Sequence, residues 1–231
     1  MTRTFRALSA LLSYPTGELQ AAAPDLWNAF ERENLVPATA RRALDVLLEE
    51  IAAGDLYDLQ ERYVLLFDRT RSLSLHLFEH VHGESRDRGQ AMIDLKAQYE
   101  RHGLFISAAE LPDYLPLFLE YLSTLPFDEA RELLGQPAHI LAGISQRLRQ
   151  RKSPYEAVFR ALGALASAAP DAAAVAAVLD EPDPDPADLA ALDAAWEDAP
   201  VAFGPGAATS CKEGLIARIR AGRRPAPQVQ A

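Results

Sequence analysis

The side chains most capable of chemistry lie in two overlapping stretches of the chain. Residues 77–89 contain two His, two Glu, one Asp and two Arg. The pattern His76-Leu-Phe-Glu79-His80 has the H-x-x-E-H form of an inverted zinc-protease motif. On a helix, His76 and His80 would lie one turn apart, Glu79 could act as a base, and Glu156 could supply a third ligand. This pattern therefore predicts one alternative function, that of a zinc-dependent hydrolase.

A polar junction between two helices is the interpretation that we favour for the same residues. The apolar segment 73–81 is predicted to form a short helix, with His76 at the boundary of its buried face. Gly83 then supplies a turn, and the next helix carries Arg88 near its start, where a cation opposes the helix dipole. Arg86 and Arg88 therefore need acidic partners, such as Asp87, Glu79 or Asp68. We expect a connected polar network made of Glu79, His80, His82, Glu84, Arg86, Asp87 and Arg88.

The elements that position these residues are predicted to be helices. Apolar residues recur at helical spacing along residues 3–168, and no convincing strand-like alternation interrupts them. Thr16 and Asp55 are suited to cap helix starts, and Ser153 with Glu156 has the spacing of a capping box. We therefore predict an all-α fold, a single-domain helical bundle of about nine helices. Around the polar junction the predicted helices cover residues 73–81, 85–102 and 112–125. The side chains expected in the core are Phe67, Leu77, Leu95, Leu119 and Phe159.

Composition excludes several classes of protein. Apolar residues make up 49% of the 231 residues, which is enough for a full core. The formal net charge of −10 disfavours nucleic-acid binding, because phosphate contacts require a basic face. Cys211 is the one cysteine, so no disulfide can form within the chain, and no run of about 18 apolar residues is present to span a membrane. We expect a cytoplasmic protein without a stable membrane association.

The composition changes after residue 170. No Lys or Arg occurs between Arg160 and Lys212, although nine acidic residues lie from Asp171 to Asp198. Such a segment repels itself, and its prolines interrupt helices. We therefore divide the chain into a helical domain, residues 1–169, and a flexible, acidic, Pro/Ala-rich C-terminal arm, residues 170–231, which we expect to be partly disordered. A short apolar stripe in the arm could cover an empty binding groove, or the arm could be a solubilising tail; the stripe is Leu189, Leu192 and Trp196.

Two short motifs resemble the signatures of one protein superfamily. Tyr63-x-x-Leu66-Phe67-Asp68 resembles the Y/F-x-x-L-F-D/E signature of the TorD/DmsD/NarJ redox-enzyme maturation chaperones. Glu110-Leu-Pro112-Asp113 resembles their second signature, E-x-P-D-H, except that Tyr114 stands in place of the His. Residues 66–90 and 111–122 resemble the NarJ branch in particular, the delta chain of respiratory nitrate reductase. The resemblance covers roughly residues 5–165.

This resemblance implies a function without catalysis. It implies an all-helical chaperone that binds the N-terminal segment of the nitrate reductase catalytic (alpha) subunit and assists molybdenum cofactor insertion before membrane attachment. It also implies molybdenum cofactor biosynthesis proteins as further partners, and we expect no bound cofactor or metal. A generic helical adaptor stays open as an alternative. The candidate client-binding residues are Tyr63, Leu66, Phe67, Asp68, Glu79, His80, His82, Glu84, Arg86, Asp87, Arg88, Asp113, Tyr114, Glu120 and Tyr121.

Overall fold

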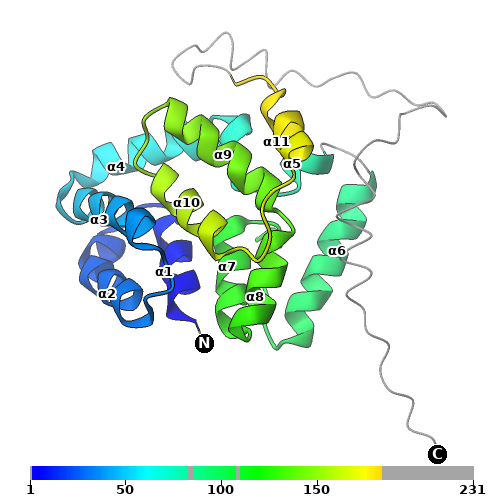
Figure 1. Ribbon diagram of the computed structural model, residues 1–231, viewed down its shortest axis with the longest axis horizontal. Coiled ribbons are helices and arrows are strands. Elements are labelled where there is room, and N and C mark those ends of the chain that lie inside the picture. The colour runs from blue at the N-terminus through cyan, green and yellow to red at the C-terminus, as the bar shows by residue number, and fades with distance from the viewer. Residues whose placement is uncertain (1, 83–85, 108–109, 184–231) are drawn as a thin grey trace, which may run out of the picture.

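The computed structural model describes residues 2–82, 86–107 and 110–183, although not the side chains of His82, Arg86 and Asp87. Within these residues the chain forms eleven α-helices and no strand, so the predicted all-α class is confirmed (Figure 1). The first seven are α1 (Arg3–Leu11), α2 (Gly17–Glu33), α3 (Ala38–Ala53), α4 (Leu56–Tyr63), α5 (Glu79–His82), α6 (Arg86–Arg101) and α7 (Leu115–Thr124). The last four are α8 (Phe127–Gly135), α9 (Ala138–Gln150), α10 (Glu156–Leu165) and α11 (Ala172–Leu179).

Capping side chains define two of the helix starts, as the sequence predicts. The Thr16 hydroxyl accepts a hydrogen bond from the Leu19 N–H at 3.2 Å, and Asp55 accepts from Tyr57 N–H at 2.9 Å. The capping box predicted at Ser153 was wrong. The Ser153 N–H donates to the Leu148 carbonyl, which holds this residue in the turn that follows α9, and α10 begins only at Glu156.

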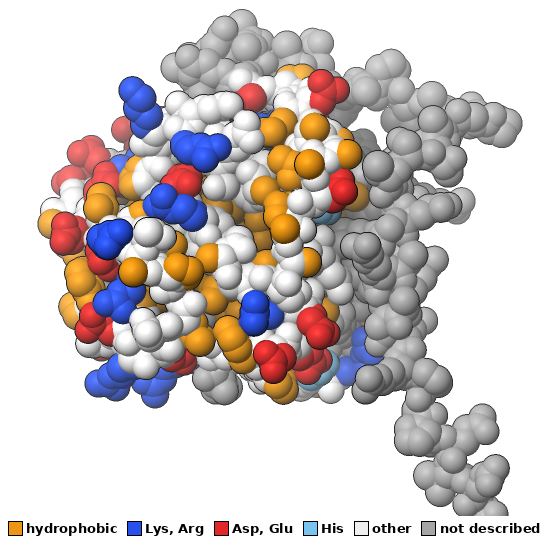
Figure 2. All heavy atoms as spheres, viewed as in Figure 1, with side chains coloured by type: hydrophobic (Ala, Val, Ile, Leu, Met, Phe, Trp, Pro, Cys, Tyr) orange, Lys and Arg blue, Asp and Glu red, His pale blue; other side chains and the backbone are white. Residues whose placement is uncertain are grey.

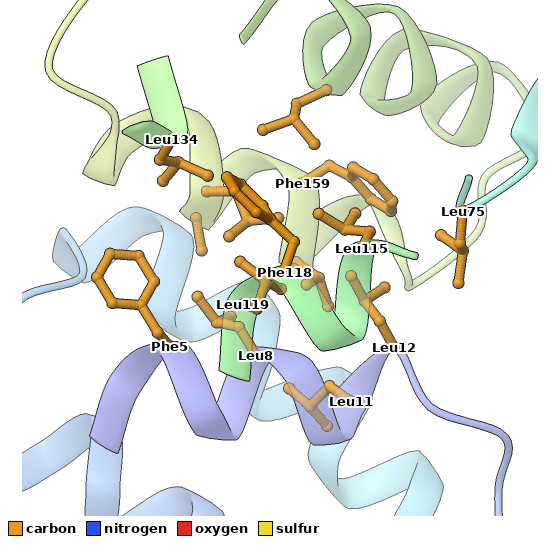
Figure 3. Packing of buried hydrophobic residues seen from close by; sticks show 14 of the residues in the cluster. Phe5, Leu8, Leu11, Leu12, Leu75, Leu115, Phe118, Leu119, Leu134 and Phe159 are labelled. Carbon is orange, nitrogen blue, oxygen red and sulfur yellow. The ribbon is translucent and has the colours of Figure 1, made fainter. Parts of the chain in front are cut away.

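The centre of the core lies between α1 and α7. Figure 3 shows Phe5 and Leu8 of α1, and Leu12 just after its end, facing Leu115, Phe118 and Leu119 of α7. The two helices are also joined by a hydrogen bond of 2.7 Å from the Ser9 hydroxyl to the Pro116 carbonyl. All five side chains predicted for the core are buried, which confirms that part of the prediction.

The helix predicted at 73–81 was wrong. The chain instead forms a 3₁₀ turn, η2 (Arg71–Leu73), then an extended segment, and only then the short α5. Backbone hydrogen bonds to a segment distant in the sequence keep residues 75–77 extended. Leu77 N–H donates to the Asp113 carbonyl at 3.1 Å, and Leu115 N–H donates to the Leu75 carbonyl at 2.8 Å. His76 and Tyr114 thereby form an isolated antiparallel bridge. The same pairing delays α7, which begins at Leu115 and not at the predicted residue 112.

A further helix, α11, follows residue 170 and packs on α9. Asp171 caps it, accepting from the Ala174 N–H at 2.8 Å. The two helices approach so closely at Gly143 that a Cβ there would lie 2.6 Å from Val178 Cγ1. Arg147 of α9, whose side chain is buried, donates to the carbonyls of Ser72, Val178 and Glu181.

The sequence did not predict α11. The domain boundary at residue 169 stays a prediction, and the arm's stripe of Leu189, Leu192 and Trp196 lies outside the described residues. Among the helices that the structure describes, none combines the length and the apolar character needed to cross a membrane.

Candidate functional site

The two signature motifs meet in space through a pair of tyrosines. The first motif lies where α4 passes into a π-helical turn, η1 (Val64–Asp68), a local form that is frequent at functional sites. The Tyr63 hydroxyl donates to the Leu12 carbonyl at 2.9 Å and lies 3.2 Å from the Tyr114 hydroxyl of the second motif. Burial raises the pKa of Tyr63, so its hydroxyl stays protonated.

The apolar members of the first motif build the support of this site. The Phe67 ring packs at 5.0 Å from the Tyr63 ring and edge-on at 5.1 Å from the Tyr155 ring, measured between centroids. Leu66 is buried beside them. Because Tyr63, Leu66 and Phe67 are all covered, they position the surface residues of the motif and do not themselves offer a binding surface.

Asp113 organises the junction between the two distant segments. Its side chain is fully buried, and its Oδ2 atom accepts from the Phe78 N–H at 3.1 Å. Its Oδ1 atom lies 3.3 Å from His76 Nδ1, with the His76 side chain about one-third exposed. The hydrogen bond to Asp113 raises the pKa of His76, against the opposing effect of burial. Asp113 therefore fixes both the backbone at Phe78 and the ring of His76.

His80 is engaged by the backbone. Its Nε2 atom lies 2.8 Å from the Ser74 carbonyl, so the Nε2–H donates, and burial lowers the pKa of the ring. The zinc alternative requires His76 and His80 on one helical face, but only His80 lies in a helix, and the two rings have separate partners. Within the residues described, no group of three or more His, Cys, Asp or Glu side chains could hold a metal.

Part of the predicted polar network is present. Arg88 Nη2 lies 3.4 Å from Glu79 Oε1, which confirms the acidic partner expected for Arg88. Glu84 and the side chains of His82, Arg86 and Asp87 lie outside the described part of the chain, so their place in the network stays a prediction.

Glu120 and Tyr121 lie further along α7. Tyr121 is buried against Tyr99 of α6, with ring centroids 4.7 Å apart, and its hydroxyl lies 3.2 Å from Gln98 Nε2. The Tyr99 hydroxyl in turn donates to the Pro112 carbonyl at 2.7 Å, next to Asp113. Tyr121 thus supports the junction from behind, whereas Glu120 is exposed.

Four partly exposed residues form the accessible face of the junction, and we call them the junction surface: Tyr14, Asp68, His76 and Tyr114. Tyr14 packs edge-on against Tyr63, with centroids 5.6 Å apart, and the His76 and Tyr114 rings lie 5.3 Å apart. Partial burial raises the pKa of Asp68, and nearby His76 opposes that shift. An aromatic surface with one carboxylate and one imidazole is suited to holding a peptide, since each ring offers both an apolar face and a polar edge.

Sequence reasoning missed two members of this surface. Tyr14 lies between two helices, outside any helical pattern, so spacing gave no indication of its role. His76 was assigned to a helix boundary, although the alternation of apolar and polar residues from Leu73 to Leu77 was a usable signal for extended backbone.

Comparisons with known proteins agree on one family. The sequence profile of the "Nitrate reductase delta subunit" family matches residues 33–161, a span that contains the junction surface apart from Tyr14. The chain is 48% identical to the "Nitrate reductase molybdenum cofactor assembly chaperone NarJ" of Escherichia coli (strain K12), over 85% of this chain and 83% of that protein. It is 50% identical to the "Probable nitrate reductase molybdenum cofactor assembly chaperone NarW" of the same strain, over 68% of this chain and 67% of that one. A probable NarJ of Bacillus subtilis (strain 168) is 34% identical over 69% of this chain and 85% of that protein.

Proposed function

Because this chain belongs to the nitrate reductase delta subunit family, we propose that it is an assembly chaperone for the molybdenum cofactor of nitrate reductase, and not an enzyme. The observation that carries the proposal is the 48% identity to NarJ across most of both chains. In more detail, the protein binds the N-terminal segment of the apo catalytic subunit. It assists insertion of the molybdenum cofactor in the cytoplasm, before the enzyme attaches to the membrane, and it works beside cofactor biosynthesis proteins.

The junction surface is the proposed place of client binding. Buried contacts hold its exposed rings in place: Tyr63 and Phe67 lie below, and Asp113 fixes the segment that carries His76. A preformed surface loses less conformational entropy when a peptide binds, because its side chains are already ordered. The acidic net charge favours a client segment that carries basic residues.

The two buried titratable groups of this site, Asp113 and His80, are placed to hold the backbone and not to take part in a reaction. The carboxylate of Asp113 is buried and engaged by a backbone N–H, and the ring of His80 is engaged by a backbone carbonyl. A general base must reach the proton that it removes from a substrate, and neither group faces an open surface.

Calorimetric titration of the full chain with a synthetic N-terminal peptide of the nitrate reductase catalytic subunit tests the proposal. We expect a dissociation constant between micromolar and nanomolar, about −8 to −12 kcal/mol. The substitutions Asp68→Asn and His76→Gln should each weaken binding severalfold, because each removes a polar contact at the surface. Asp58→Asn, at an exposed position near the start of α4, is the matched control and should change nothing.

The outcomes separate the alternatives. If the peptide binds and the two variants bind equally well, the chaperone function stands and the junction surface is the wrong site. If neither the peptide nor the intact apo catalytic subunit binds, the chain is a generic helical adaptor and the proposal fails.

A further inference from the structure

Several buried polar atoms that lack a hydrogen-bond partner in the described part of the chain lie in one small region. They are the Nε and Nη2 atoms of Arg62, the Ser153 hydroxyl and the Tyr155 hydroxyl. The Arg62 guanidinium lies over the Tyr155 ring, with Cζ 5.9 Å from the centroid. Folded proteins satisfy nearly all such groups, so a cluster of exceptions requires a cause, and an absent ligand is one.

The orientation of Arg62 indicates what kind of ligand is absent. Its Nη1 atom is engaged by the Glu50 carboxylate, which leaves Nε and Nη2 on the other side of the guanidinium. These two N–H groups form the edge of arginine that binds an oxyanion through two parallel hydrogen bonds. Arginine has donors only, and burial raises the pKa of Tyr155 to about 12, so its phenol also keeps a proton to donate. The missing partner is therefore an acceptor.

A pocket with a volume of about 690 Å³ is lined by two of these residues, Arg62 and Ser153. Its wall carries Arg62 from the end of α4, and Arg151, Lys152 and Ser153 from the turn between α9 and α10. Three cations therefore converge at one place in a protein whose net charge is −10. Figure 2 shows Lys and Arg side chains on the part of this face where α9 and α10 lie in Figure 1. Leu65 and Pro154 add apolar wall, and the volume is within the range of small-molecule sites.

The chain itself places one carboxylate in this pocket. Asp183 Oδ1 accepts from Arg151 Nη2 at 2.5 Å and also from the Ser72 hydroxyl. This contact shows that the pocket can hold an oxyanion. It engages Arg151 but leaves the Nε and Nη2 atoms of Arg62 and the Ser153 hydroxyl without acceptors. A group with more oxygens and more charge than a carboxylate is needed to serve all of these donors.

We propose that the pocket between α4 and the α9–α10 turn binds the phosphoryl group of a small phosphorylated molecule. Arg62, Lys152 and Ser153 contact the phosphoryl oxygens, and the ligand displaces Asp183 from Arg151. The Nε and Nη2 atoms are closed off from solvent, so the Arg62 guanidinium turns towards the pocket when the ligand enters. The rest of the molecule lies against Leu65 and Pro154. This site is separate from the client-binding proposal and does not depend on it.

The test is calorimetric titration of the full chain with inorganic phosphate, pyrophosphate and adenosine monophosphate, at constant ionic strength. We expect saturable binding, weakened at least tenfold by Arg62→Gln and by Lys152→Gln. Asp183→Asn removes the competing carboxylate and should tighten binding. The matched control is Arg149→Gln, which removes an exposed cation of α9 that does not line the pocket. Since Lys152 is exposed, its variant tests the site even if Arg62→Gln does not fold.

The three probes identify the source of the phosphoryl group. Tighter binding of adenosine monophosphate than of phosphate assigns the site to a phosphate ester that uses the apolar wall, whereas equal affinity assigns it to free phosphate. Absence of saturable binding, or equal weakening by Arg149→Gln, overturns the proposal.

Discussion

Asp113 shows how much one buried carboxylate can determine. It lies 36 residues after Leu77 in the chain, yet its carbonyl and its carboxylate bind two consecutive N–H groups, those of Leu77 and Phe78. It also orients the ring of His76. The second signature motif is therefore structural at its aspartate, while its last position, Tyr114, contributes to the surface.

Replacement of Asp113 should destabilise the fold. Asp113→Ala removes the oxygen that accepts from the buried Phe78 N–H, so we expect the free energy of unfolding to fall by about 3 kcal/mol. Asp113→Asn keeps one acceptor oxygen and should lose only about 1 kcal/mol. Urea denaturation measures both, with Asp128→Asn at an exposed position as control. Equal losses for Ala and Asn would contradict the role given to the carboxylate as acceptor.

The two histidines of the H-x-x-E-H pattern should titrate on opposite sides of the ordinary histidine pKa. The hydrogen bond to Asp113 raises the pKa of His76, and burial lowers the pKa of His80. Resonances of the two rings in an NMR titration should therefore have midpoints above and below about 6.5. Assigning each ring requires the variants His76→Gln and His80→Gln. A midpoint for His80 above that of His76 would refute the burial argument.

These shifts predict opposite effects of pH on stability. The raised pKa of His76 gives stabilisation that is complete below about pH 6.5 and is lost as pH rises through the folded pKa. The lowered pKa of His80 gives a stability term that is present above about pH 6.5 and is lost as pH falls. His76→Gln should therefore flatten the alkaline side of a stability profile, and His80→Gln the acidic side, in thermal melts from pH 5 to 8.

At the scale of elements, the sequence predicted the helices that begin at a capping side chain, but it did not predict the conformation of residues 73–81. Thr16 and Asp55 mark their helices through contacts two or three residues away, so the sequence alone contains the cause. Residues 73–81 adopt their form because of hydrogen bonds to residues 113–115, a partner that no local pattern reveals. Phe67 was placed correctly in the core, but the candidate site also needed Tyr14, which only the folded chain brings to Tyr63.

The contact between α9 and α11 allows a sharp test of packing. Gly143→Ala places a Cβ against Val178, so we expect a loss of about 1–3 kcal/mol in the free energy of unfolding. Val178→Ala in the same chain removes the clash and should recover part of that loss, which a double-mutant cycle measures. Gly163→Ala in α10 meets no atom within 4 Å and should instead stabilise by about 0.5–1 kcal/mol. If Gly143→Ala and Val178→Ala have additive effects, α9 and α11 are not in contact at these residues.

At the scale of the whole molecule, one described helix, α11, follows the compositional change at residue 170 and packs on α9. Arg147 is buried and needs the carbonyls of Val178 and Glu181 as acceptors. This acidic stretch therefore contains a structural element, since Val178 of α11 is buried against Gly143 of α9, whereas the acids at its two ends, Asp171 and Asp180, are exposed.

Truncation after different residues should locate the end of the folded domain. A chain that ends at Asp183 keeps every described contact and should unfold at the temperature of the full chain. A chain that ends at Pro170 exposes α9 and leaves Arg147 with one acceptor, so we expect a loss on the order of 3 kcal/mol. Differential scanning calorimetry compares the three proteins. Identical unfolding temperatures for all three would place α11 outside the cooperative domain.

The π-helical turn η1 is equivalent to one surplus residue inserted into the end of α4. Each residue advances an α-helix by about 100°, so the surplus residue rotates everything after it by that angle relative to an unbroken helix. Deleting a single residue within Val64–Leu65 would restore regular winding and turn Asp68 away from His76 while leaving Tyr63 in place. The spacing of the signature motif thus sets the direction in which the chain leaves α4. A change in the length of the motif should therefore disturb the site more than a change of one side chain.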